Sequence, residues 1–374
     1  MMDQAVLLET RQTSAGQTIG IIRLNAPKSL NALSMAMIEP MYAQLKHWAE
    51  YDDVVAVWME AEGDKAFCAG GDVVQLYHGM TASADAATTL ATSYFGAEYR
   101  LDYLIHTYPK PLIVWGHGIV MGGGLGLMSG ASHRVVTESS RIAMPEITIG
   151  LYPDVGASWF LNRMPGRCGY FLGLTGAQIN AADACFVGLA DRCIANDQRQ
   201  AVFEALCEAV TAVDLADQQV HQVLKDFEAQ DTSQWPEAQV QSHFDVIQSL
   251  TDAANDERLI EQLLSYDGDD PWLSRAAQTL AAGSPSSMRL IIDQLRRSRH
   301  LSLAQVFQEE LVVSVQSCLK GEFAEGVRAL LVDKDKKPQW QYPTAESVPS
   351  AWIDDFHRLP WGDQRHPLSD LQTC

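Results

Sequence analysis

Two glycine-rich turns and two carboxyl groups downstream of them are the residues of this chain best suited to chemistry. The turns are residues 67–72 (FCAGGD) and 116–124 (GHGIVMGGG), and the acids are Glu146 and Asp154. Because glycine has no side chain, each turn can present bare backbone N–H groups to a ligand. Two such donors aimed at one oxygen form an oxyanion hole, which stabilises an enolate or a tetrahedral oxyanion. The pattern therefore predicts acyl chemistry without a metal.

The two acids have a structural as well as a catalytic interpretation. Each follows a proline, so Glu146 could start a helix and Asp154 could cap one. Their position after two donor-rich turns favours a catalytic pair, and so does the apolar stretch around them: Ile147, Ile149, Leu151 and Val155. Apolar surroundings raise a carboxyl pKa towards neutrality, which suits general acid–base catalysis.

The second turn also resembles a dinucleotide-binding fingerprint. Gly116, Gly118 and Gly122 follow an apolar run, and Glu138 stands about 20 residues further on. The glycine spacing is one residue too long for that fingerprint, and a similar turn precedes it. We therefore disfavour a nucleotide-binding fold.

Net charge and cysteine placement limit the partners. A net charge of −20 argues against nucleic acid, and a phosphorylated ligand would need local cations such as Lys28 or Lys65, although both could be solvated surface residues. The seven cysteines form no CxxC pair, so a structural metal site is not expected. Cys68, in the first turn, is interpreted as a packed small residue rather than a nucleophile, because no likely base lies near it in the sequence. The fold would have to bring a base such as His117 close to it.

Apolar patterning predicts an α/β architecture that positions these residues. Strands are expected at residues 18–24, 54–59, 112–115, 134–137 and 141–144. A helix capped by Ser34 should bury Met37, Ile38, Met41, Leu45 and Trp48, with Pro40 bending it or marking a later start. Residues 73–108 and most of 198–337 read as helical. We expect three parts: residues 1–205 as the core with the acyl site, 206–345 as a helical C-terminal region, and 346–374 as a surface tail.

Several separate segments carry a family resemblance. Residues 25–33 (NAPKSLNAL), 66–72 (AFCAGGD) and 121–127 (MGGGLGL) resemble the enoyl-CoA hydratase/isomerase (crotonase) superfamily. Residues 143–156 (AMPEITIGLYPDVG) and 325–335 (EGVRALLVDKD) closely resemble one of its subgroups, the 3-hydroxyisobutyryl-CoA hydrolases. The resemblance spans about residues 15–345.

The resemblance implies a fold and a set of site residues. The fold would be a crotonase-like spiral of repeated ββα units with an extended helical C-terminal region. Gly71 and Gly123 would donate the oxyanion-hole N–H groups, and Glu146 and Asp154 would carry the proton chemistry. Further positions would contact substrate or CoA: Lys28, Leu30, Ala32, Ala69, Gly70, Asp72 and Gly122.

One departure from the hydratase pattern separates the possible reactions. Hydratases of the superfamily use two glutamates, and the first would fall at Gly126 here. Asp154 stands where hydratases commonly have glycine. The resemblance therefore implies thioester hydrolysis of a short 3-hydroxyacyl-CoA, such as 3-hydroxyisobutyryl-CoA in valine catabolism. An enoyl-CoA isomerase or hydratase, or a non-catalytic acyl-CoA-binding protein, are the alternatives.

The same reasoning sets the expected cofactors, partners and location. CoA is part of the substrate, so no separate cofactor and no metal are expected. The sequence has no apolar run of bilayer length and starts without a signal or transit pattern. We therefore expect a cytoplasmic enzyme without membrane or nucleic-acid partners, able to form a homo-oligomer.

Overall fold

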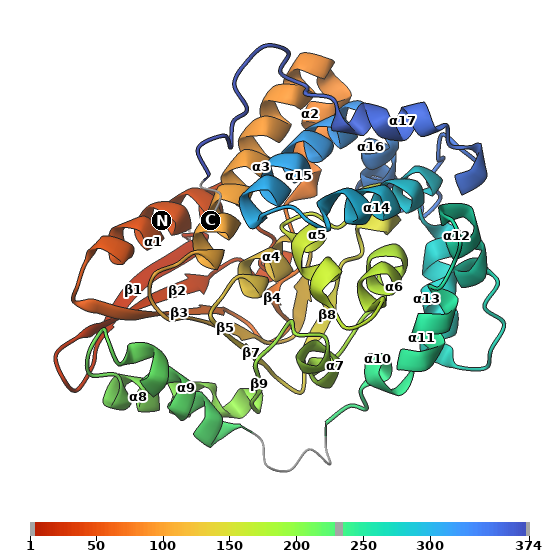
Figure 1. The fold of residues 1–374 in the computed structure, drawn as a ribbon. Coiled ribbons are helices and arrows are strands. Elements are labelled where there is room, and N and C mark those ends of the chain that lie inside the picture. Colours follow the sequence, from red (N-terminus) through yellow and green to blue (C-terminus); the bar gives the residue numbers. More distant parts are fainter. Residues whose placement is uncertain (1–3, 229–234, 372–374) are drawn as a thin grey trace. The chain divides into compact units, whose positions relative to one another are not determined.

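The computed structural model describes residues 4–228 and 235–371 (Figure 1). The chain forms two compact units that are interleaved along the sequence. The first unit comprises Met1–Gly71, Arg100–Ile142 and Ile179–Ser242, and the second comprises Asp72–Tyr99, Ala143–Gln178 and His243–Cys374. Each unit draws on segments from both sides of residue 205, so the three-part division expected from the sequence stays a prediction.

The first unit is built on a six-stranded sheet of order β1-β2-β3-β5-β7-β9. β1 and β2 pair antiparallel, and the remaining neighbours pair in parallel. A second sheet has the order β4-β6-β8, with β4 and β6 parallel. The strands are β1 (Val6–Gln12), β2 (Thr18–Leu24), β3 (Val54–Ala61), β4 (Ala66–Cys68), β5 (Leu112–Gly116), β6 (Ile119–Met121), β7 (His133–Val136), β8 (Arg141–Ala143) and β9 (Arg192–Cys193).

Helices of the first unit pack an apolar core against the larger sheet. Trp58 of β3 lies between Trp115 and Phe203, with ring centroids 5.6 and 5.5 Å away. Phe203 comes from α8, which forms a pair with α9 (Figure 1). The helices are η1 (Pro27–Ser29), α1 (Met35–Glu50), α4 (Gly123–Ser129), α7 (Ala181–Phe186), η4 (Asn196–Gln198), α8 (Arg199–Ala209), α9 (Ala216–Phe227) and α10 (Gln239–Ser242).

The second unit is helical in its described residues. Its long helices α14 and α15 each bury about half or more of their residues, and α3 carries the chain from this unit into the first. The helices are α2 (Val73–Ala82), α3 (Ala84–His106), η2 (Glu146–Ile149), α5 (Ala157–Phe160), η3 (Leu161–Arg163), α6 (Cys168–Thr175), α11 (Phe244–Leu250), α12 (Asp256–Leu264), α13 (Pro271–Ala282), α14 (Pro285–Ser298), α15 (Leu303–Leu319), α16 (Glu322–Val327), the π-helix η5 (Arg328–Val332), η6 (Ala345–Ser347), α17 (Ser350–Asp354) and η7 (Asp355–His357).

The five predicted strands are confirmed, but the short strands β4, β6 and β9 were not predicted. The helix expected after Ser34 is α1, and it buries the five residues named above. It runs unbroken from Met35 through Pro40, so the later start is wrong. The sequence reasoning also did not identify β1, because most of this strand is exposed and lacks an apolar alternation.

Helix length and hydropathy decide whether a helix can cross a membrane. Among residues 4–228 and 235–371, no helix combines the length and apolar character that crossing a bilayer requires.

Candidate active site

The two glycine-rich turns lie next to each other in the first unit. They follow β4 and β6, which are parallel neighbours, so both turns leave the same edge of the small sheet. A Cβ atom at Gly70 would lie 3.5 Å from the carbonyl oxygen of Met121 and 4.0 Å from the amide nitrogen of Gly123. The structure thus brings together two turns that are about fifty residues apart in the chain.

The backbone of these turns requires glycine. Gly70 has φ of 109° and Gly122 has φ of 48°, which residues with side chains rarely adopt. At Gly124, a Cβ would approach the carbonyl oxygen of Cys68 to 2.4 Å. Gly123 is the first residue of α4, where an N–H has no partner within the helix. In the described residues, neither Gly71 nor Gly123 donates its N–H to a turn or loop carbonyl, so both remain available as ligand donors.

The predicted CoA-contacting loop is tied to the first turn. Leu30 and Asn31 both adopt left-handed φ angles, 55° and 54°. The carbonyl oxygen of Leu30 accepts a 3.1 Å hydrogen bond from the Ala69 N–H, and Leu33 donates to Gly70 at 2.8 Å. The loop and the turn therefore form one rigid piece, with Lys28 exposed, Leu30, Ala32 and Ala69 half-buried, and Gly70 and Gly122 buried.

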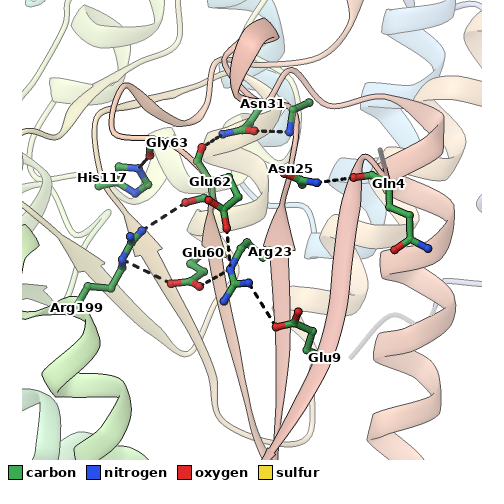
Figure 2. Close-up of polar contacts among 12 residues, drawn as sticks. Gln4, Glu9, Arg23, Asn25, Asn31, Glu60, Glu62, Gly63, His117 and Arg199 are labelled. Carbon is green, nitrogen blue, oxygen red and sulfur yellow. Dashed lines mark hydrogen bonds and ion pairs between the residues drawn. The ribbon is translucent and has the colours of Figure 1, made fainter. Parts of the chain in front are cut away.

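Asn31 is the residue that holds this loop in place. It is 1% exposed, and its side-chain oxygen accepts from the Ala26 N–H at 2.8 Å while its amide nitrogen donates to the carbonyls of Glu62 and Ala66 at 3.0 and 2.9 Å (Figure 2). Below it, Glu60 accepts from Arg23 at 2.7 Å and pairs with Arg199 at 3.7 Å. These contacts fix the end of β3 and the connection to β4, from which the first turn departs.

Cys68 and His117 take structural positions. Cys68 is buried behind Gly124, which agrees with its interpretation as a packed small residue. The Nε2 atom of His117 lies 2.7 Å from the carbonyl oxygen of Gly63 (Figure 2), and burial lowers the pKa of this imidazole.

Glu146 is a buried carboxyl group in the second unit. It begins η2 and is 5% exposed. Among the described residues, its Oε2 atom has no hydrogen-bond partner. Burial raises its pKa well above the ordinary value, and the charges of Asp154 and Glu98 act in the same direction. A carboxyl group with one unengaged oxygen and a raised pKa can serve as a nucleophile or a general base near neutral pH.

Asp154 is the second buried acid of this unit. It is 5% exposed, and its Oδ2 atom accepts a 2.6 Å hydrogen bond from the Tyr99 hydroxyl. Burial raises the pKa of Asp154 to about 6, although the Tyr99 hydrogen bond opposes that change. Tyr99 is itself held by Ser314 at 2.7 Å, and Ser314 lies 3.0 Å from the hydroxyl of Tyr152. The carboxylate is therefore oriented by a chain of buried hydroxyl groups.

Glu310 of α15 fixes the loop that carries Asp154. Its two carboxylate oxygens accept from the backbone N–H groups of Gly156 and Ser158 at 2.7 and 3.0 Å. Val155, next to Asp154, has φ of 53°, a costly conformation for a β-branched residue. Burial raises the pKa of Glu310 to about 8. The loop is thus held in a strained conformation by a buried acid, which is a feature common at functional sites.

The distal motif at residues 325–335 supports the loop that carries Glu146. A Cβ at Gly326 of α16 would lie 2.2 Å from the carbonyl carbon of Ile149, so glycine allows α16 to pack directly on η2. Arg328 bonds Glu325 through two nitrogens at 2.8 Å and pairs with Asp333 and Asp335 at 2.6 and 2.8 Å. Arg328 is half-buried at the centre of this network, whereas residues 333–337 are exposed.

Several important residues escaped sequence reasoning. Tyr99, Glu98 and Glu310 lie in long helices and far from the acidic pair in sequence. One signal was available, since Glu310 and Ser314 are polar residues spaced four apart among the mostly apolar residues of the helix's buried face. Asp72 lies at the N-cap of α2, in the second unit, without a side-chain capping bond. In the described part of the chain, no three His, Cys, Asp or Glu side chains form a group that could hold a metal.

Comparison with known proteins identifies one matching family model and sequence relatives that share one name. Residues 19–357 match a family model described as enoyl-CoA hydratase/isomerase. The chain is 36% identical over 338 residues to the mitochondrial 3-hydroxyisobutyryl-CoA hydrolase of Gallus gallus, covering 90% of this chain and 85% of the relative. It is 37% identical over 337 residues to the protein of the same name from Danio rerio, covering 90% and 86%.

Solved structures show the same fold. An enoyl-CoA hydratase from Rhodobacter sphaeroides superimposes with a TM-score of 0.80 at 31% identity, covering 94% of this chain and 97% of that one. A carnitinyl-CoA dehydratase from Mycobacterium thermoresistibile gives 0.82 at 31% identity, covering 95% and 97%. These similarities confirm the predicted fold class, a crotonase-like α/β core with a helical C-terminal region.

Proposed function

Because the chain belongs to the enoyl-CoA hydratase/isomerase family, we propose that it hydrolyses the thioester of a short 3-hydroxyacyl-CoA. The substrate we propose is 3-hydroxyisobutyryl-CoA, and the products are 3-hydroxyisobutyrate and CoA, a step of valine catabolism. Relatives at 34–37% identity carry this hydrolase name.

The observation that carries the proposal is the buried acidic pair. Glu146 and Asp154 are each 5% exposed, and the charge of Asp154 raises the pKa of Glu146. Hydration in this family would need a glutamate where this chain has Gly126, a buried residue of α4. A single glutamate with an aspartate partner suits attack on a carbonyl carbon better than addition of water across a double bond.

In the proposed reaction, the N–H groups of Gly71 and Gly123 donate to the thioester oxygen as negative charge develops on it. Removing one donor of this kind typically costs about 2.7–4 kcal/mol of transition-state stabilisation. Glu146 attacks the carbonyl to form a mixed anhydride, or it removes a proton from the water that attacks. Either route ends with water added to the acyl group and CoA released as a thiol.

Asp154 is proposed to bind the 3-hydroxyl group or to pass a proton to the leaving sulfur. A buried acid that pairs with a substrate hydroxyl discriminates strongly against analogues without it, because the acid is then left unsatisfied. The remaining positions are proposed to contact CoA or the acyl group: Lys28, Leu30, Ala32, Ala69, Gly70, Asp72 and Gly122.

The proposal includes no cofactor, since CoA is part of the substrate. A homo-oligomer and a cytoplasmic location also remain predictions for this chain. The relatives named above carry the word mitochondrial in their names, so fractionation of cells expressing the full chain is the direct test of location.

The test of the reaction class compares two esters in a thiol-release assay. We expect 3-hydroxyisobutyryl-CoA to release CoA thiol at a rate proportional to enzyme, and crotonyl-CoA to lose neither its thioester nor its double bond. Consumption of the crotonyl double bond without thiol release would show an isomerase or hydratase instead. Tight binding of both esters without any turnover would show a non-catalytic acyl-CoA-binding protein.

A further inference from the structure

Two cysteine thiols lie in contact in the first unit, in elements to which the proposed thioester chemistry assigns no role. Cys185 belongs to α7 and Cys193 to β9, and both are free and half-buried. Their Sγ atoms are 3.4 Å apart. A disulfide needs about 2.05 Å between sulfurs, so these two atoms must approach by a little over ~1 Å to form one.

The backbone around the pair is firmly held, so this contact does not depend on a loose loop. Arg134 of β7 donates to the carbonyl of Gly188 at 2.8 Å and to the carboxylate of Asp191 at 2.9 and 2.7 Å. The N–H of Leu189 also donates to the carbonyl of Ala184 at 2.8 Å. The connection between α7 and β9 is therefore anchored at both ends, which keeps the two sulfurs together.

We propose that Cys185 and Cys193 form an intramolecular disulfide when the protein meets a peroxide, which makes this pair a thiol-oxidation site. The Cys185 sulfur attacks one peroxide oxygen, the O–O bond breaks, and one water leaves. The resulting sulfenic acid is attacked by the Cys193 sulfur, the S–S bond forms, the S–O bond breaks, and a second water leaves with the Cys193 proton. Two thiols are oxidised and one peroxide is reduced to two waters.

The surroundings of the pair set the order of attack. The hydrogen bond with Cys193 lowers the pKa of Cys185, and the charge of Arg134 lowers it further. Burial and the charges of Glu228 and Asp191 oppose this change. The same hydrogen bond and burial raise the pKa of Cys193, and the carbonyl of Ala181 at 3.7 Å is an alternative acceptor for its single thiol proton. Cys185 is thus the better nucleophile, and Cys193 keeps the proton until the second step.

The other four described cysteines serve as controls for reactivity towards peroxide. They are buried, whereas Cys185 and Cys193 are half-buried. Peroxide reaches exposed thiolates before buried thiols, so the pair should react first. The internal comparison set is Cys68, Cys168, Cys207 and Cys318.

The experiment treats the full-length protein with hydrogen peroxide, alkylates the remaining thiols after denaturation, and maps the peptides by mass spectrometry. Before alkylation, we expect the intact protein to be lighter by two hydrogen atoms. After alkylation, we expect a cross-linked peptide pair containing Cys185 and Cys193, and recovery of both alkylation sites after reduction by dithiothreitol. Full alkylation of both cysteines after treatment would overturn the proposal, as would separate oxidation of each sulfur without a cross-link.

A matched pair of variants tests the order of attack. In Cys193→Ser, Cys185 should stop at the sulfenic acid and be captured by dimedone. In Cys185→Ser, the dimedone adduct at Cys193 should be at least several-fold weaker. Equal or reversed labelling would contradict the assignment of Cys185 as the attacking thiol.

Discussion

Replacing Asp154 by asparagine is expected to stabilise the folded protein at neutral and alkaline pH, although the proposal assigns Asp154 to the reaction. Burial raises the pKa of this carboxyl from its ordinary 3.8 to about 6. Each factor of ten in proton affinity corresponds to about 1.36 kcal/mol. The difference of about 2.2 between the two pKa values therefore means that ionising Asp154 in the folded state costs about 3 kcal/mol of stability.

The sign of the pH dependence follows from the raised pKa. The folded state holds this proton more tightly than the unfolded state, so the penalty is absent well below pH 3.8 and grows as pH rises through about 6. The gain from Asp154→Asn should be about 3 kcal/mol at about pH 8 and about half of that at about pH 5. Asparagine keeps an oxygen that accepts the Tyr99 hydrogen bond. Loss of the charge also lowers the pKa of Glu146, which adds to the gain.

The assay is urea unfolding followed by tryptophan fluorescence at both pH values. The control is Asp269→Asn, which removes one negative charge at an exposed position and so reports the effect of net charge alone. A gain no larger than that of the control at about pH 8, or a gain that does not shrink at about pH 5, would refute the reasoning.

Three further predictions concern the catalytic and packing residues. Glu146→Gln should lower thiol release by about a thousandfold or more while leaving CoA-ester affinity nearly unchanged, and retained turnover would exclude its assigned role. Gly124→Ala should destabilise by about 1–3 kcal/mol in thermal unfolding, because its Cβ meets Cys68. Gly96→Ala in α3 should be neutral or stabilising, because a Cβ there would meet no atom within 4 Å. Tyr99→Phe removes a hydrogen bond that lowers the pKa of Asp154, so the acid limb of kcat/KM against pH should move to higher pH. An unmoved limb would contradict a role for ionised Asp154.

The sequence was sufficient to predict the features that depend on local pattern. The burial of α1 followed from apolar spacing, and the two glycine turns followed from composition. Glu146 and Asp154 were recognisable because they interrupt an apolar stretch, and both are buried. These features can be predicted from a few neighbouring residues.

What the sequence could not supply depends on contacts between distant segments. The Tyr99–Asp154 bond joins residues 55 positions apart, and the Tyr99–Ser314 bond joins residues 215 apart. No periodicity predicts such pairs. The left-handed backbone of Asn31 and Val155 was equally hidden, because neither residue type signals a positive φ as reliably as glycine does.

The most direct test of the central claim is the ratio of kcat/KM for 3-hydroxyisobutyryl-CoA to that for isobutyryl-CoA, both measured by thiol release. The two esters differ by one hydroxyl group, which the account pairs with a buried carboxyl group. We predict a ratio of at least about a hundred in favour of the hydroxy ester. Equal rates for the two esters would contradict selection by the acidic pair, and no thiol release from either would contradict the hydrolase itself.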